Sequence, residues 1–167
     1  AQTLAGHVNN TVWVDQDYFF VMKFNRPVID SLYLPMGETE KGKRIIATFD
    51  LKPGDELMMK VALSTTSVEG AKKNLQAEIP DWNFDGVKLA AHDEWNSYLS
   101  RMDVEGTDDE KTNFYTCFYH ALIRPNQISD VDGMYRNAAD SIVKAGTGTF
   151  YSTFSLWDTY RAAHPFY

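Results

Sequence analysis

The sequence is poor in cysteine, with Cys117 as the only one among 167 residues. A single cysteine excludes an internal disulfide and a zinc site built from several thiolates. Free cysteines are usually buried as small hydrophobic side chains, so we expect Cys117 to lie in the core. Long apolar runs are also missing: none approaches the roughly 18 to 20 residues that a membrane-spanning helix needs. The sequence therefore predicts no membrane span.

Basic residues are scarce as well, since 16 Lys and Arg stand against 23 Asp and Glu, and the net charge at pH 7 is −7. Proteins that hold a phosphate backbone do so with clustered Lys and Arg, and no such cluster occurs here. The sequence therefore argues against a nucleic-acid partner. P-loop, dinucleotide-binding and Ser-His-Asp patterns are missing too, so nothing specific favours nucleotide or esterase chemistry.

Aromatic side chains, in contrast, are abundant, with ten Phe, nine Tyr and four Trp. They supply large packing surfaces and also flat faces that stack on sugars or bases, and composition alone does not choose between these uses. At 44% hydrophobic and 23% charged residues, the chain has the composition of a globular protein. Its length is sufficient for one ordinary domain with a packed core.

Residues 1–66 have the alternating pattern of antiparallel strands. Short runs of aromatic and aliphatic residues are separated by turn formers such as Pro and Gly. The predicted strands are Thr11–Val14, Tyr18–Phe24, Arg44–Phe49 and Glu56–Ser64. Residues before them, including His7, are expected to form a frayed terminus. One face of such a sheet is apolar and needs a second layer to cover it.

Around Ser67 the hydrophobic period changes from two to about 3.6, which predicts a switch from strands to helices. Ser67 is placed to cap a short helix that Pro80 ends. A second helix is predicted over residues 85–103, where apolar side chains form a stripe and charged ones lie opposite. His92 falls on the charged side and is expected to be solvated.

Thr107 and Glu110 have capping-box spacing, which predicts the start of a third helix that runs to about Ile123. This helix is apolar over more than one face, as expected of a helix packed inside a larger helical assembly. His120 on this helix is expected to be a core histidine rather than a ligand. The rest of the chain offers few partners for so much apolar surface.

The region after Pro125 runs for roughly 30 residues with few regular patterns, and long irregular segments are usually functional when they are ordered. Asp130, Asp132 and Gly133 share features with part of a calcium-binding loop, in which oxygen ligands alternate before a Gly. The downstream Glu of such a loop is missing, so a plain turn is favoured. A short helix is predicted over Asn137–Lys144.

Both ends of the chain are expected to result from trimming or truncation. The chain begins at Ala1 with neither Met nor a signal sequence, as expected of a mature or trimmed protein. Ser155 is placed to cap a new helix, and the chain stops soon afterwards at Tyr167 with an apolar ending. This ending indicates an interrupted chain.

Asp158 is the carboxylate with the strongest case for a function, and two compatible interpretations apply to it. As the third residue after Ser155, it is placed to bond back to a Ser cap, and its negative charge is favourable near the positive end of the helix dipole. It also lies between Trp157 and Arg161, where a carboxylate beside a stacking ring accepts hydrogen bonds from sugar hydroxyls.

Several uncommon aromatic motifs occur in a fixed order in the second half of the chain. They are FYTCFYH at Phe114–His120, Pro125 with Asn126, SDVDGMYR at Ser129–Arg136 and FSLWDTYRAAHP at Phe154–Pro165. Together these motifs resemble glycoside hydrolase family 92. The similarity extends upstream to about Val12, so it covers nearly the whole chain.

This resemblance implies an α+β fold, in which part of an N-terminal antiparallel β-sandwich is followed by linker helices and the start of an (α/α)6 barrel. Residues 1–66 are then a partial β-sandwich without its opening portion, and residues 67–84 are a linker helix and loop. Residues 85–167 are the first helices and loops of a truncated catalytic barrel. The missing remainder of the polypeptide is expected to complete both parts.

The resemblance also implies an activity, the calcium-dependent, exo-acting removal of terminal α-mannose from mannose-rich glycans with inversion, by an enzyme that is secreted, periplasmic or outer-surface associated in a bacterium. In the family the general acid, the general base and the calcium ligands lie beyond the SLWDTYR motif. None is therefore assigned to this chain, and the fragment alone is expected to be inactive. Asp158 is implied to bond the terminal mannose, with Trp157 and Arg161 as neighbours, while the roles of Asp130 and Asp132 stay open.

A non-catalytic carbohydrate-binding module is the main alternative, because a sandwich with exposed aromatic side chains can hold glycans without cleaving them. A structural or interaction fragment without sugar affinity is a third possibility. The helical half argues against a binding module, which has no use for a broadly apolar helix that needs barrel partners.

Overall fold

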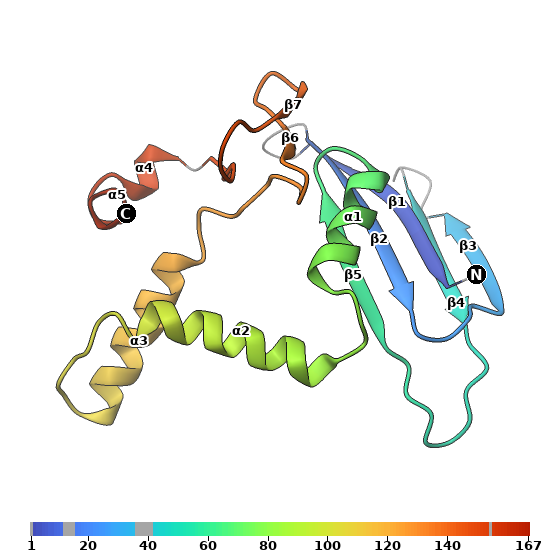
Figure 1. The fold of residues 1–167 in the computed structure, drawn as a ribbon, viewed down its shortest axis with the longest axis horizontal. Helices are drawn as coiled ribbons and strands as arrows, with labels where there is room; N and C mark the ends of the chain where they lie inside the picture. Colours follow the sequence, from blue (N-terminus) through green and yellow to red (C-terminus); the bar gives the residue numbers. More distant parts are fainter. Residues whose placement is uncertain (1, 12–15, 36–41, 154) are drawn as a thin grey trace.

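The chain folds into strands over its N-terminal part and mostly helices over its C-terminal part (Figure 1). The computed structural model describes residues 2–11, 16–35, 42–153 and 155–167. In chain order the elements are β1 (Thr3–Asn10), β2 (Gln16–Phe24), β3 (Asp30–Pro35), β4 (Lys43–Thr48), β5 (Met59–Ser64), α1 (Val68–Glu78), α2 (Phe84–Leu99), α3 (Asp108–Leu122), β6 (Met134–Arg136), β7 (Ile142–Lys144), α4 (Leu156–Thr159) and α5 (Ala163–Phe166). The α+β class predicted from the sequence is confirmed.

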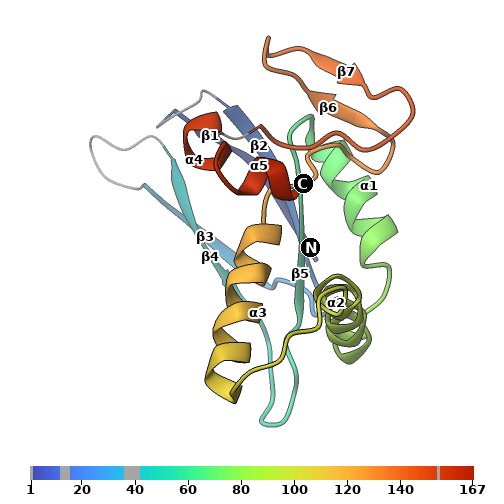
Figure 2. The same cartoon turned by 90° about the vertical axis from the view of Figure 1, so that its left-hand side faces the viewer.

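The first sheet consists of β1, β2 and β5 in antiparallel pairing with β2 in the middle, and β3 pairs with β4 in a separate hairpin. Helix α1 covers one face of this sheet (Figure 2). The core between them holds Val21, which is 1% exposed, with Ala62, Ala71 and Leu75. Because Val21 and Ala62 are register partners, their side chains point to the same face and meet α1 together.

The other face of the sheet is largely open in the described part of the chain. The β3–β4 hairpin lies on this side (Figure 2), where Phe49 approaches Phe24 with 5.0 Å between ring centroids. On β5, however, Met59, Val61 and Leu63 alternate with buried residues and are exposed. An apolar sheet face needs a second packed layer, which the described residues supply only in part.

The Lys60 side chain binds the chain just beyond the C-terminal end of α1. The residue is only 8% exposed, and its Nζ donates hydrogen bonds to the carbonyls of Ile79, Pro80 and Asp81 at 2.6, 3.1 and 3.1 Å. Ile79 is the C-cap of α1, and Pro80 and Asp81 follow it in the linker, so the ammonium group lies just beyond the negative end of the helix dipole. Burial lowers the pKa of Lys60, and the charge of Lys23 adds to this effect. The linker after α1 is thereby tied to β5.

Helices α2 and α3 form an arm that leads away from the sheet (Figure 1). Thr107 and Glu110 make the predicted capping box, with both reciprocal hydrogen bonds present. Trp95 on α2 meets Tyr119 on α3 edge to face, with 4.5 Å between ring centroids. The two helices therefore contact each other through an aromatic pair.

Most of the predicted elements are confirmed. Strands β2, β4 and β5 match predicted strands, although β5 begins only at Met59. Ser67 caps α1, since its Oγ accepts a hydrogen bond from the Gly70 N–H at 2.9 Å. Helix α2 ends at Leu99 rather than at residue 103. The strand predicted at Thr11–Val14 falls mainly on residues 12–15, which lie outside the described residues.

Two local predictions are wrong. His7 does not belong to a frayed terminus, because it lies in β1, where pairing with β2 brings its ring within 5.9 Å of the Phe19 ring centroid. Asn137–Lys144 is not helical, because β7 pairs with β6 in a hairpin. Asp140 in the connecting turn has φ 59°, a left-handed conformation that does not continue a right-handed helix.

Among the described residues the burial predicted for Cys117 and His120 is also wrong, because both side chains are exposed on α3. Their side of the helix has no covering layer among the described residues, so residue type alone misjudges their environment. His92 on α2 is exposed, as predicted. Within the described ranges, none of the helices has the length and apolar character that a membrane crossing requires.

Candidate functional site

The predicted sugar-contacting residues lie on α4 and the turn that follows it. Trp157 is 85% exposed, and Asp158 and Arg161 are exposed as well. Arg161 Nε donates a hydrogen bond to the Tyr160 hydroxyl at 2.7 Å, and its guanidinium lies 5.5 Å from the centroid of that ring. This short stretch presents an indole face, a carboxylate and an oriented guanidinium to solvent. Such groups can stack on a sugar ring and bond its hydroxyls.

The predicted cap in front of Asp158 is not formed. The side chain of Ser155 makes no capping hydrogen bond, and the Asp158 N–H bonds the Ser155 carbonyl at 3.2 Å instead. The N–H that a Ser155 cap would bind is therefore already paired with the backbone of the same residue. Within the described part of the chain the Asp158 carboxylate accepts no hydrogen bond, so its oxygens are available to a ligand.

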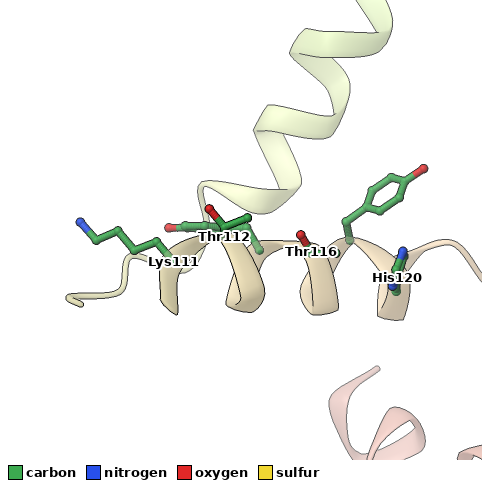
Figure 3. Close-up of a pocket in the computed structure, with 6 residues that line it drawn as sticks. Lys111, Thr112, Thr116 and His120 are labelled. Atoms are coloured by element: carbon green, nitrogen blue, oxygen red, sulfur yellow. The ribbon is translucent and has the colours of Figure 1, made fainter. Parts of the chain in front are cut away.

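Helix α3 carries a polar side next to its aromatic ones. Thr112, Thr116 and His120 recur every four residues and lie in a row along the helix (Figure 3). The row belongs to a shallow hollow of 560 Å³ lined by Lys111, Thr112, Tyr115, Thr116, Tyr119 and His120. The hollow offers hydroxyl, imidazole and ammonium groups but no carboxylate, so by itself it lacks the acid pair of a glycosidase.

Asp130, whose role the sequence leaves open, lies at the junction between the sheet and the irregular segment. The residue is buried, with 4% of its surface exposed. Its Oδ2 accepts hydrogen bonds from Ser64 Oγ at 2.8 Å and Thr66 Oγ1 at 2.6 Å. Its Oδ1 accepts one from Asn74 Nδ2 at 2.8 Å. A single carboxylate therefore joins the end of β5, the turn after it and α1 to the segment that precedes β6.

Asp132 and Arg136 extend this junction on its more exposed side. Lys73 Nζ lies 2.8 Å from Asp132 Oδ2. The ammonium group and the Met134 N–H lower the pKa of Asp132, and the carboxylate in turn raises the pKa of Lys73. Arg136 Nε donates to the Thr65 carbonyl at 2.9 Å. The SDVDGMYR motif therefore attaches this segment to the β5–α1 region.

Calcium does not fit the residues of this motif. Within the described residues, no group of three or more His, Cys, Asp or Glu side chains is placed to hold a metal ion. Asp130 and Asp132 already face N–H and O–H donors, including the ammonium group of Lys73, whereas calcium requires a shell of oxygen acceptors. The plain turn that the sequence favours is present, since the Gly133 N–H bonds the Asp130 carbonyl at 2.8 Å.

The sequence interpretation missed Ser64, Thr66 and Asn74 as partners of Asp130. A signal was present, because hydroxyl groups at the end of an otherwise apolar strand need hydrogen-bond partners when they are buried. The partner of Ser64 and Thr66, however, lies 66 and 64 positions away along the chain. Sequence spacing gives no indication of a pairing over this distance.

Residues 70–167 match the family model of the glycosyl hydrolase family 92 catalytic domain. The match covers more than half of the chain, and the chain belongs to this family. No curated protein matches the chain.

Solved structures of the family contain the same fold. The family GH92 α-mannosidase BT3965 from Bacteroides thetaiotaomicron is 28% identical, with a TM-score of 0.87 over 99% of this chain and 24% of that chain. The family GH92 inverting mannosidase BT2199 from Bacteroides thetaiotaomicron VPI-5482 is also 28% identical, with a TM-score of 0.82 over 99% of this chain and 24% of that chain. This chain thus spans about a quarter of the length of either structure.

Proposed function

We propose that residues 1–167 work as part of a larger glycoside hydrolase, an exo-acting α-mannosidase that removes terminal mannose from mannose-rich glycans. The observation that carries the proposal is the family match over residues 70–167, together with the similarity of nearly the whole chain to two mannosidases. One of them, BT3965, has also been solved in complex with mannoimidazole. The other is an inverting mannosidase, and we extend inversion to this protein.

In this proposal α4 and the turn after it form one wall of the site for the terminal mannose. Asp158 accepts hydrogen bonds from sugar hydroxyls, and Trp157 packs its ring against the sugar. Arg161, which is held by Tyr160, donates from a fixed position. The exposure of Trp157 together with its neighbours Leu156 and Tyr160 supports this assignment, because a contiguous exposed apolar patch marks a surface that binds a ligand or another part of the protein.

The bond-breaking groups are proposed to lie outside residues 1–167. Inversion requires one protonated carboxyl group that donates to the leaving oxygen and one carboxylate that activates water on the opposite face of the sugar. Calcium, when bound by ligands elsewhere in the enzyme, supplies a positive charge for sugar hydroxyls. The present residues bind and orient the substrate, and we propose that the enzyme acts outside the cytoplasm, where bacteria meet such glycans.

The test compares the full-length enzyme, the 167-residue chain and two full-length variants. Asp158→Ala removes the proposed sugar contact, and Asp103→Ala removes another exposed acid as a matched control. Full-length enzyme is expected to release mannose from α-mannosides, and the 167-residue chain is not. Asp158→Ala should lower kcat/KM by about a hundredfold, because sugar hydroxyls are left without their acceptor. The thermal midpoints of both variants should match the wild type.

Three outcomes contradict parts of the proposal. Mannose release by the 167-residue chain at an enzyme-like rate would show that the acid pair lies within it. Unaltered turnover by Asp158→Ala would remove Asp158 from the sugar site. Glycan binding without hydrolysis by the full-length protein would favour a carbohydrate-binding module. NMR of the first-formed anomer checks inversion, and loss of activity on calcium chelation, restored by added calcium, checks the metal.

A further inference from the structure

We propose that Asp130 is a positioning residue of the mannosidase site, because its buried carboxylate fixes the segment that leads from α3 to α4. The inference rests on the proposed function, since it takes Trp157 and Asp158 on α4 as sugar-binding residues. Asp130 does not touch the sugar in this arrangement. It acts through the backbone that carries those two side chains.

The Asp130 carboxylate and its three hydrogen-bond donors, here called the anchor, hold this segment in one position. Its three donors, Ser64, Thr66 and Asn74, are each buried with it. Hydrogen bonds to an ionised carboxylate are stronger than those between neutral groups. The donors are themselves fixed, because Ser64 Oγ accepts from the Thr66 N–H at 2.9 Å and Asn74 Oδ1 accepts from the Val131 N–H at 2.9 Å. A carboxylate enclosed in this way fixes the position of its own segment relative to β5 and α1, and it is not accessible to a ligand.

Backbone hydrogen bonds carry this fixed position along the chain. Ile128, two residues before Asp130, donates its N–H to the Phe150 carbonyl at 2.9 Å. Ser152 donates its N–H to the Asn126 carbonyl at 2.7 Å, and its hydroxyl oxygen accepts from the Asn126 N–H at 3.0 Å. The stretch before Asp130 therefore runs beside the stretch that ends at Ser152.

The same pairing leads directly to the proposed sugar contacts. Tyr135 on β6 stacks on Phe150, with 3.8 Å between ring centroids and 17° between ring planes, and this contact supports the pairing from a second side. Helix α4 begins at Leu156, four positions after Ser152. So short a connection restricts where Trp157 and Asp158 can lie once Ser152 is fixed.

The test uses four variants of the full-length enzyme. Asp130→Ala removes the acceptor, and Asp130→Asn keeps the size while its amide N–H can donate to Thr66 Oγ1 only, because Ser64 Oγ already accepts from the Thr66 and Ser67 N–H groups. Thr66→Val removes one donor and keeps nearly the same shape. Asp132→Asn is the matched control, because it breaks only the more exposed ion pair on the same turn.

Each variant is examined by hydrogen–deuterium exchange and by separate measurement of kcat and KM. Asp130→Ala should speed exchange in residues 126–130 and 150–158 while β2 keeps its protection. It should also lower kcat/KM for an α-mannoside by about tenfold or more, because small displacements of binding groups reduce rates strongly. Asp130→Asn and Thr66→Val should have smaller effects of the same kind, and Asp132→Asn should stay within about twofold of wild type.

A kcat/KM like that of wild type for folded Asp130→Ala overturns the positioning role, and so does faster exchange confined to residues 64–74. If Asp130→Ala does not fold, the same two measurements on Thr66→Val decide the question. Failure of the wild-type enzyme to release mannose would instead refute the proposed function. If exchange at residues 150–158 were still faster in Asp130→Ala, Asp130 would fix this segment, but the segment would not belong to a mannosidase site.

Discussion

Gly70 on α1 and Asp130 lie so close together that a Cβ added to Gly70 would overlap Oδ2 of the carboxylate. The same Cβ would lie 2.7 Å from Ser64 Oγ and 2.8 Å from Thr66 Oγ1. All three atoms belong to the buried hydrogen-bond network. Helix α1 can therefore approach the end of β5 only because residue 70 has no side chain.

Gly70→Ala is expected to destabilise the full-length enzyme by about 1 to 3 kcal/mol, because overpacking forces buried groups out of place. The direction is informative, since Ala is favoured over Gly inside a helix and would otherwise stabilise it. Thermal unfolding measures the effect. Gly146→Ala is the control, because a Cβ there meets no heavy atom within 4 Å. A Gly70→Ala variant more stable than wild type would contradict this packing.

Lys60→Met should destabilise the enzyme by about 2 kcal/mol or more, because three carbonyl groups of the C-cap of α1 and the linker after it lose a charged donor in a buried place. Met keeps most of the apolar stem, so the loss reports the ammonium group. Lys88→Met, on the exposed surface of α2, is the matched control and should change stability little. Equal midpoints in thermal unfolding would show that water replaces the ammonium group at no cost.

The Asp132–Lys73 pair predicts a response to acid. The pKa of Asp132 is held below its ordinary value, so as the pH falls the unfolded chain takes up a proton before the folded chain does. The stabilisation is therefore complete above about pH 5 and is lost as the pH falls through the unfolded and then the lowered folded pKa. Wild type should unfold slightly above Asp132→Asn at neutral pH, by no more than about one or two degrees for an exposed pair, with the difference disappearing in acid.

Lys73→Met should give the same acid response as Asp132→Asn, since either substitution removes the pair. Thermal midpoints measured from neutral pH down to strong acid test this. A difference between wild type and both variants that persists in strong acid would assign their effect to packing rather than to charge.

Thr107→Ala should weaken the first turn of α3, because it removes the side-chain acceptor for the Glu110 N–H. The loss of such a cap costs about 1 kcal/mol. Faster amide exchange at the start of α3 measures it. Thr112→Ala, on the exposed side of the same helix, is the control and should leave exchange unchanged or slower, because Ala is the better helix former.

Cys117 reports whether other parts of the enzyme cover α3. In the 167-residue chain its exposed thiol is expected to react with a thiol reagent at about the rate of a free cysteine. In the full-length enzyme the reaction should be at least about tenfold slower, because burial limits access to the thiolate. Equal rates in the two proteins would show that this side of α3 stays open in the enzyme.

Local sequence signals were sufficient to predict the strands and helices whose ends are set by nearby residues, such as capping residues. Ser67 caps α1 and Thr107 caps α3 as their spacing predicts. Strand β1 was missed because residues such as Gly6 carry little apolar signal. The position of β1 depends on its pairing with β2. The Phe20 ring on β2 would lie 3.0 Å from a Cβ added to Gly6. The need for a glycine at position 6 can be recognised only once β1 and β2 are paired.

The environment of the candidate site was harder to predict than its residue types. The turn at Asp130 was predicted, but its burial was not, because the burial depends on donors supplied by β5 and α1. Cys117 was predicted to be buried from residue type, yet burial requires a neighbouring layer that the described residues do not supply. The sugar-contact roles of Trp157, Asp158 and Arg161 remain predictions.

The open side of β5 has a practical consequence for protein preparation. In the described sheet β5 lies at an edge, and the side chains of Met59, Val61 and Leu63 are exposed on one face of it. Such an edge can add a strand from a second molecule, so the 167-residue chain is expected to aggregate as its concentration rises. Expression of the full-length gene, in which we expect the rest of the polypeptide to cover this sheet, is therefore the better source of material.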